Sequence, residues 1–230
     1  MKKRYICVIP ARKGSKRIKN KNIIKINNKP IISYVISTAK KTNLFKEIIV
    51  STDSKKIKKI SEKYGASVPF IRDKNISGDH SLSIEVLKDV IKKRKIQDKY
   101  IFFFYPTSIL VNFNDIKRAF SIFKRKKADC LISVKEFESN PLRMLFSDNN
   151  FVKFKFKKYQ KKNSQNLEKF YFDAGYFYIF RTEQLINSSK FLPKKTIMYK
   201  LKKYSSIDLN EPEDLKFLKF LFKYNSNGKF

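Results

Sequence analysis

The sequence predicts an α/β protein with a doubly wound, mostly parallel sheet. Short apolar segments typical of buried strands alternate with amphipathic segments of helical spacing through the first half of the chain. The segment YIFFFY at 100–105 is apolar without interruption, as expected for a strand covered on both faces. Linkers rich in Gly, Pro or Ser are missing, so we expect residues 1–230 to form a single domain.

The elements follow one another in a regular order. The apolar run YICVI at 5–9, bounded by Pro10, predicts the first buried strand. Further strands are expected at 47–52, 67–71, 100–105, 130–134 and 173–180. Helices are expected at 30–41, 54–64, 81–93, 114–126, 181–188 and 211–222. Proline in the first turn of the helices at 30–41 and 211–222 supports where they begin.

The alternation stops between about 136 and 169. Within this section FVKFKF at 151–156 alternates with period two, which is typical of a half-exposed antiparallel strand. We interpret the section as a small inserted flap that contains a hairpin and meets a second subunit.

The chain is strongly basic. It carries 53 Lys and Arg against 20 Asp and Glu, a formal net charge of +33. Such a charge is typical of proteins that bind nucleic acid or anionic membranes. Here lysine is spread from end to end and accompanies many Ile, Asn and Phe residues, which indicates a codon bias toward A and T. We therefore expect no nucleic-acid partner, and we give arginines more weight than lysines.

The cysteines, the histidine content and the hydropathy of the chain further restrict the class of protein. Cys7 and Cys130 fall inside apolar strands, as expected of buried free thiols in a reducing compartment. His80 is the single histidine, which leaves little room for a histidine metal site. No apolar run approaches the length of a membrane span. We expect a cytoplasmic protein with no membrane partner.

Polar residues gather where the expected strands end, and the ligand crevice of an open α/β sheet is built from strand ends. The stretches are 11–22, with one Gly and one Ser among cations, then 72–81, 105–108 and 206–210. Backbone N–H groups and cations in the first stretch suit a polyphosphate, although a solvated basic loop fits the same residues. The stretch 72–81 is equally compatible with a surface loop that caps a helix.

The stretch 206–210 contains a candidate site for a metal ion. Asp208 and Asn210 share one side of an extended segment, and their oxygens suit Mg²⁺, which also takes ligands from substrate phosphates. Asn210 alternatively caps the last helix. Cations for phosphate, an Mg²⁺ site and the lack of a nucleophile triad together indicate phosphoryl or nucleotidyl transfer.

Three motifs resemble those of the acylneuraminate cytidylyltransferases, the CMP-sugar synthetases. They are A-R-x-G-S-K-R-I-x-x-K-N at 11–22, S-T-D at 51–53 and P-T-S at 106–108. The resemblance covers nearly the whole chain in the right order. It implies a Rossmann-like nucleotidyltransferase fold, a requirement for CTP and Mg²⁺, and transfer of CMP to a nine-carbon keto sugar acid. It also implies a homodimer in which the two chains complete each other's sugar site.

Within that family several details resemble the pseudaminic acid branch. They include G-A-x-V-P-F-x-R at 65–72, D-H-S at 79–81 and Tyr105, where sialic acid enzymes typically have glutamine. The pseudaminic acid branch is also similar in two further motifs, S-Q-x-L at 164–167 and D-A-G-x-F-Y at 173–178. Sialate, legionaminate or a shorter keto sugar acid remain alternative substrates, and a homologue that binds CTP without turnover remains a further alternative. The alternative from a different class is a non-catalytic basic protein that binds nucleic acid.

The resemblance also implies roles for individual residues. It assigns catalysis to Arg12, Lys16, Lys21 and Asp208, nucleotide binding to Ala11, Arg12, Gly14, Ser15, Asn22, Arg72, Asp79 and Ser83, sugar binding to Tyr105, Thr107, Gln165 and Asp173, and Mg²⁺ binding to Asp208 and Asn210. Two positions depart from the family pattern. Asn163 stands where arginine is common, and Asn210 replaces the second aspartate of the metal pair, so it offers an oxygen without a charge.

Overall fold

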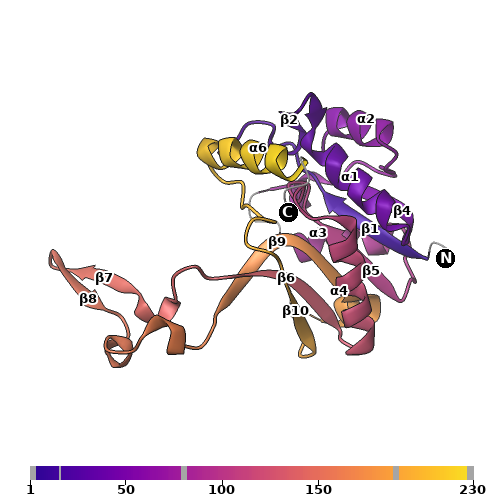
Figure 1. The fold of residues 1–230 in the computed structure, drawn as a ribbon. Helices are drawn as coiled ribbons and strands as arrows, with labels where there is room; N and C mark the ends of the chain where they lie inside the picture. Colours follow the sequence, from indigo (N-terminus) through magenta and orange to yellow (C-terminus); the bar gives the residue numbers. More distant parts are fainter. Residues whose placement is uncertain (1–3, 16, 79–81, 189–191, 227–230) are drawn as a thin grey trace.

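The computed structural model describes residues 4–15, 17–78, 82–188 and 192–226 (Figure 1). Its main sheet has six strands in the order β10-β6-β9-β5-β1-β4. Their bounds are Thr196–Lys200, Cys130–Glu136, Tyr171–Arg181, Tyr100–Phe104, Tyr5–Pro10 and Phe45–Ser51. Only β9 runs antiparallel to its neighbours in this sheet. The predicted α/β fold with a mostly parallel sheet is confirmed.

Six α-helices are described: α1 (Ile31–Thr42), α2 (Lys55–Lys63), α3 (Ser83–Lys93), α4 (Phe113–Arg125), α5 (Thr182–Asn187) and α6 (Pro212–Ser226). Their ends follow local chemistry. Ser54 caps α2 by accepting a hydrogen bond from the N–H of Ile57 at 3.4 Å, and Asn112 caps α4 through two backbone N–H groups. Asn43 ends α1 in the left-handed conformation. None of these helices is long and apolar enough to cross a membrane.

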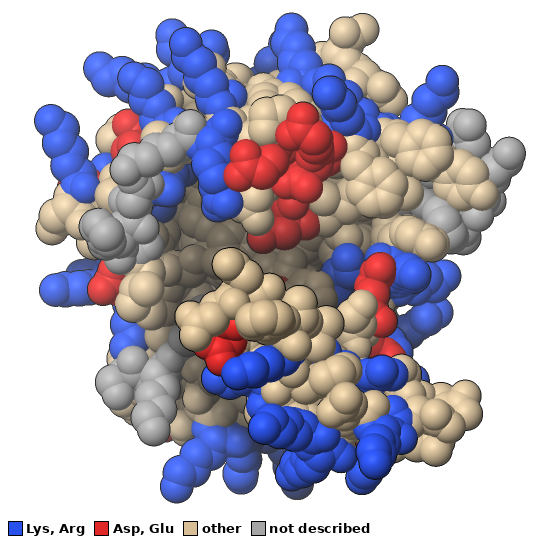
Figure 2. Space-filling model, turned by 90° about the vertical axis from the view of Figure 1, so that its left-hand side faces the viewer, with Lys and Arg blue, Asp and Glu red and all other residues tan. Residues whose placement is uncertain are grey.

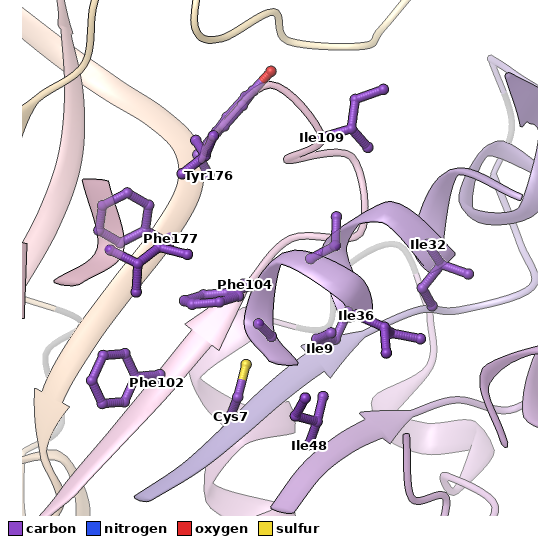
Figure 3. Packing of buried hydrophobic residues seen from close by; sticks show 14 of the residues in the cluster. Cys7, Ile9, Ile32, Ile36, Ile48, Phe102, Phe104, Ile109, Tyr176 and Phe177 are labelled. Carbon is purple, nitrogen blue, oxygen red and sulfur yellow. The ribbon is translucent and has the colours of Figure 1, made fainter. Parts of the chain in front are cut away.

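The helices cover both faces of the sheet, which makes it doubly wound. Buried side chains of α1, α2, α4 and α6 pack on one face, and those of α3 and α5 pack on the other. Strands β1 and β5 feed both cores: Cys7 and Phe102 point to the first, Val8 and Phe103 to the second. Figure 3 shows the first core between α1 and the sheet. The uninterrupted apolar runs of these two strands follow from this double burial.

The predicted strand at 67–71 is wrong. The segment makes only two isolated bridges to β4 and its end, Ile49 to Ser67 and Thr52 to Ile71. Pro69 lies between them and has no N–H to donate, which interrupts the ladder. Conversely, the sequence did not predict edge strand β10 or the two-stranded pair β2 (Lys25–Ile26) and β3 (Lys29–Pro30).

The section at 136–169 contains a second small sheet. Strands β7 (Leu145–Asp148) and β8 (Phe151–Phe154) pair antiparallel, as the period-two pattern predicts. The remaining short elements are the 3₁₀ turns η1 (Lys21–Ile23), η2 (Lys74–Ile76), η3 (Pro141–Arg143), η4 (Lys157–Tyr159) and η5 (Ser164–Asn166). In Figure 1 the β7–β8 hairpin extends well away from the body of the molecule. Its apolar side chains are therefore left largely outside both cores.

Candidate functional site

A cleft of about 680 Å³ opens where β1 and β5 end and β9 begins. Figure 2 shows this hollow face, with acidic side chains gathered on one rim and cations around it. The predicted site residues that line the cleft are Arg12, Gly14, Ser15, Lys21, Asn22, Arg72, Ser83, Tyr105, Thr107, Asp173, Asp208 and Asn210. Residues from stretches far apart in the sequence thus meet at the carboxyl edge of the parallel strands, where an open sheet binds ligands.

The loop after β1 is fixed by hydrogen bonds from two sides. The side-chain amide of Asn22 donates to the carbonyl of Arg12 at 2.9 Å, and the N–H of Lys13 donates to Oδ1 of Asp53 at 2.7 Å. Asp53 follows β4, so the S-T-D motif holds the neighbouring loop in place. The backbone that carries Arg12 is therefore anchored before any ligand binds.

Lys21 lies among charges of both signs. Partial burial lowers its pKa, and the carboxylates of Asp208 and Asp214 act against that shift by favouring the ammonium form. The guanidinium groups of Arg17 and Arg12 lower its pKa further. Three cations therefore share this part of the cleft, which suits a ligand with several negative charges.

Arg72 is a buried cation in the cleft wall, with 4% of its surface exposed. Its Nε donates to Oγ of Ser77 at 3.1 Å, whereas its Nη2 is buried without a hydrogen-bond partner among the described residues. Burial lowers its pKa, Asp53 opposes that shift and Arg12 adds to it. A buried donor of this kind is costly unless a ligand satisfies it.

Hydroxyl groups line the side of the cleft near β9. Oγ of Ser83 lies 2.5 Å from the hydroxyl of Tyr105, whose pKa is raised mainly by burial. The hydroxyl of Tyr178 donates to the carboxylate of Asp173, and the N–H of Gly175 donates to the same carboxylate. Tyr178 belongs to the D-A-G-x-F-Y motif at 173–178 but is absent from the predicted site residues, because a tyrosine inside an apolar strand looks like a core aromatic.

Asp208 and Asn210 lie side by side at the acidic rim. Nδ2 of Asn210 donates to Oδ2 of Asp208 at 2.6 Å, and the N–H groups of Asn210 and Glu211 donate to Oδ2 of Asp214. No group of three or more His, Cys, Asp or Glu side chains is placed to share a metal ion within the described ranges. One carboxylate and one amide oxygen fit Mg²⁺ that completes its shell with water and substrate phosphate.

A residue of the main sheet holds the loop that carries Asp208 in place. The buried hydroxyl of Tyr176 in β9 donates to the carbonyl of Ile207 at 3.1 Å and accepts from its N–H at 2.6 Å. Burial raises the pKa of Tyr176, which keeps this hydroxyl protonated. The position of Asp208 therefore depends on a strand at the centre of the fold.

Some predicted residues are not brought into the cleft. Ala11 is fully buried and does not line the cleft, and its N–H donates to the carbonyl of Ser51 at 2.8 Å. Gln165 is exposed in η5, within the inserted section, and does not line the cleft of its own chain. Lys16 and Asp79 lie outside the described residues.

Comparison with known proteins identifies the family. The chain matches the sequence profile of the cytidylyltransferases over residues 6–226. It is 35% identical over 230 residues to the pseudaminic acid cytidylyltransferase of Campylobacter jejuni, which covers 98% of this chain and 99% of the relative. It is 32% identical over 237 residues to the CMP-N,N'-diacetyllegionaminic acid synthase of Legionella pneumophila, with 98% and 99% covered.

Solved structures agree on the fold. A CMP:2-keto-3-deoxy-manno-octonic acid synthetase complexed with CTP has a TM-score of 0.71 at 15% identity and covers 96% of this chain and 99% of its own. A 4-diphosphocytidyl-2C-methyl-D-erythritol synthase from Anaerococcus prevotii has a TM-score of 0.66 at 14% identity, with 97% and 100% covered. The expected nucleotidyltransferase fold is confirmed, and the chain belongs to the cytidylyltransferase family, whose members are CTP-dependent nucleotidyltransferases.

Proposed function

We propose that the protein transfers CMP from CTP to a nine-carbon nonulosonic acid and releases pyrophosphate. Pseudaminic acid is the preferred substrate. The observation that carries this proposal is one cleft in which Arg12 and Lys21 meet the carboxylate of Asp208. Such a cleft suits a triphosphate and a sugar acid, both of which are anions. Residues 164–178 and the relatives from C. jejuni support the choice of sugar.

The nucleotide occupies the part of the cleft formed by the loop after β1 and by Arg72. Arg12 and Lys21, with Lys16 from the same loop, neutralise the phosphates. Gly14 leaves its backbone open, since a Cβ atom there would meet no atom within 4 Å, and Ser15 follows it. Asn22, Arg72 and Ser83, with Asp79, hold the base and ribose, and the unpartnered Nη2 of Arg72 gains an acceptor.

Asp208, assisted by Asn210, would hold Mg²⁺ when the ion is bound with the triphosphate. The ion supplies Lewis-acid polarisation of the phosphoryl oxygens when it is bound. Both side chains lie in the loop that Tyr176 fixes, so the carboxylate is positioned before the substrates bind. The amide of Asn210 adds an oxygen but no charge, which leaves more of the coordination shell to the triphosphate.

The sugar acid occupies the part of the cleft lined by Tyr105, Thr107 and Asp173. Its anomeric hydroxyl attacks the α-phosphorus of CTP in line, so that an oxygen–phosphorus bond forms as the bond to pyrophosphate breaks. The hydroxyl proton leaves to solvent or to a nearby base. The cations of the cleft stabilise the charge that builds on the phosphoryl oxygens and on the leaving pyrophosphate.

A second copy of the chain pairs through the inserted section, 136–169. The β7–β8 hairpin exposes a row of apolar side chains, and Phe151 and Val152 are 72% and 70% exposed. Apolar side chains this exposed are typical of an interface. In a dimer of this kind, Gln165 of one chain reaches the sugar end of the other chain's cleft, which explains why it is remote from its own.

Pyrophosphate release tests the proposed function. CTP and Mg²⁺ are mixed with purified protein and one sugar acid at a time: pseudaminate, di-N-acetyllegionaminate, sialate and 3-deoxy-manno-octulosonate. We expect the highest kcat/KM with pseudaminate. A higher value with one of the other acids would change the substrate, and no release with any of them would refute the reaction. A second arm with ATP, GTP and UTP checks the requirement for CTP.

A further inference from the structure

Strand β9 departs from regular pairing beside the cleft. Tyr178 pairs with Ile132 of β6 and Asp173 pairs with Val134, so five steps along β9 match two steps along β6. In a regular strand, residues five apart point to opposite faces and lie about 17 Å apart at 3.3 Å per residue. The extra residues form a bulge that includes Gly175, whose φ of +61° lies in the left-handed region.

The bulge folds the chain back so that Asp173 reaches Tyr178. The Tyr178 hydroxyl lies 2.7 Å from each carboxylate oxygen of Asp173, and the N–H of Gly175 donates to Oδ1 at 2.9 Å. A carboxylate can only accept, so the single hydroxyl proton of Tyr178 is committed to Asp173. Asp173 itself remains exposed in the cleft, whereas Tyr178 is 2% exposed.

Tyr178 also packs against the other tyrosine of this wall. Its ring lies edge-on to that of Tyr105, with centroids 5.9 Å apart. The Tyr105 hydroxyl in turn lies 2.5 Å from Oγ of Ser83. Two separate hydroxyl contacts therefore line this wall, Tyr105 with Ser83 of α3 and Tyr178 with Asp173.

The wall near β9 is negative because it carries Asp173. Arg12, Arg17, Lys21 and Arg72 supply positive charge elsewhere in the cleft, where Asp208 adds a carboxylate near Lys21. A sugar acid carries one carboxylate and several hydroxyl or amide donors. Its carboxylate is repelled by Asp173 and attracted by the cations, while a hydroxyl or N–H of the sugar can donate to Asp173. The wall thus distinguishes the two ends of the substrate.

We propose that Tyr178 is a positioning residue for the sugar acid. Tyr178 holds the Asp173 carboxylate in place to accept hydrogen bonds from the donor groups of the sugar. The sugar's own carboxylate is thereby turned toward the cations. The inference rests on the proposed function and deepens it. It assigns to the bulge in β9 the recognition of a keto sugar acid with a hydroxyl or amide N–H remote from its carboxylate. It concerns binding of the sugar and leaves binding of CTP to the other part of the cleft.

Tyr178→Phe tests the inference because it removes the hydroxyl and keeps the buried ring. We expect KM for the sugar acid to rise about tenfold or more, as for the loss of a hydrogen bond to a charged group, with KM for CTP within about twofold of wild type. Tyr199→Phe is the matched control. Its hydroxyl likewise bonds an aspartate, Asp115, at 2.9 Å, but neither residue lines the cleft.

The outcomes separate the two proposals. Wild-type protein without turnover on any sugar acid refutes the proposed function. Wild-type turnover with an unchanged sugar KM in Tyr178→Phe, or with an equal rise in both KM values, refutes the role of Tyr178 alone. A purely structural hydroxyl would lower the melting temperature and the active fraction without this split. If Tyr178→Phe does not fold, Asp173→Asn at the exposed end of the same contact must show the split, and a sugar KM equal to wild type overturns the inference.

Discussion

Nδ2 of Asn210 donates a hydrogen bond to Oδ2 of Asp208 at 2.6 Å. An amide thus occupies the space where a second carboxylate would repel the first in the absence of a cation. Asn210→Asp would restore two charges, so we predict that half-maximal activity needs about tenfold less Mg²⁺, while the metal-free protein becomes less stable. Titrating Mg²⁺ in the pyrophosphate assay, with thermal unfolding in EDTA, measures both effects.

The control for this change is Asn187→Asp at the exposed end of α5, which adds the same charge outside the cleft. It should leave the Mg²⁺ titration as in wild type. A titration of Asn210→Asp that coincides with wild type would mean that the metal is held elsewhere.

Removing the cation of Arg12 should reduce turnover more than it weakens binding. Arg12→Ala deletes a charge beside the phosphates, and loss of one preorganised donor of this kind typically lowers kcat by a factor of about 10² to 10³. Single-turnover rates with saturating CTP measure the loss. Arg125→Ala, at the exposed end of α4, removes an equal charge away from the cleft and should retain wild-type rates. Near wild-type pyrophosphate release by Arg12→Ala would contradict the role.

At alkaline pH the activity should decline at a lower pH than it would if Lys21 had the pKa of an exposed lysine. Burial lowers the pKa of Lys21, so this lysine loses its proton at a lower pH than an exposed lysine. The phosphates need the charged form, hence kcat/KM for CTP declines as pH rises through that pKa. In Lys21→Arg the guanidinium stays charged, so the decline should move to higher pH.

Lys59→Arg provides the matched exchange at an exposed position of α2. Its pH profile should coincide with that of wild type. An alkaline limb that stays in place in Lys21→Arg would show that another group controls it.

The exposed hairpin should decide the oligomeric state. Phe151→Glu combined with Val152→Glu places two charges on its most exposed apolar positions, and burying them in an interface is costly. We predict a shift from dimer to monomer in sedimentation velocity, with loss of sugar-dependent turnover because Gln165 no longer reaches the second cleft. Met198→Glu alters an apolar residue, 54% exposed, on edge strand β10. Dissociation by Met198→Glu instead would place the interface at β10.

The sequence predicts the cores well because burial leaves a strong pattern. In β1 and β5 both faces are covered, and their continuous apolar runs show it. No residue of the edge strand β10 is buried, so its sequence TIMYK carries little of that signal. At 67–71 the apolar residues suggested a strand, yet Pro69 could not complete the ladder.

Some residues of the site can likewise be predicted from the sequence, and others cannot. Residues in polar loops at strand ends, such as Arg12 and Asp208, stand out because their type and place are unusual for a core. Tyr178 and Tyr176 do not, because a tyrosine inside an apolar strand reads as packing until its hydroxyl partner is known. The bulge that brings Asp173 to Tyr178 arises from sheet register, which single-sequence periodicity does not contain.

Gly175 should be needed for the shape of this bulge. Its φ of +61° costs an L-residue about 1–2 kcal/mol, although a Cβ atom there would meet nothing within 4 Å. Gly175→Ala should therefore lower the free energy of unfolding by about 1 kcal/mol, after a partial offset from the stiffer unfolded chain. Gly14→Ala is the control, since its Cβ also finds open space but its φ is not positive, so urea unfolding should show no loss. Equal unfolding free energies for the two variants would mean that the bulge tolerates a side chain, whereas a loss confined to Gly175→Ala ties the turn to its glycine.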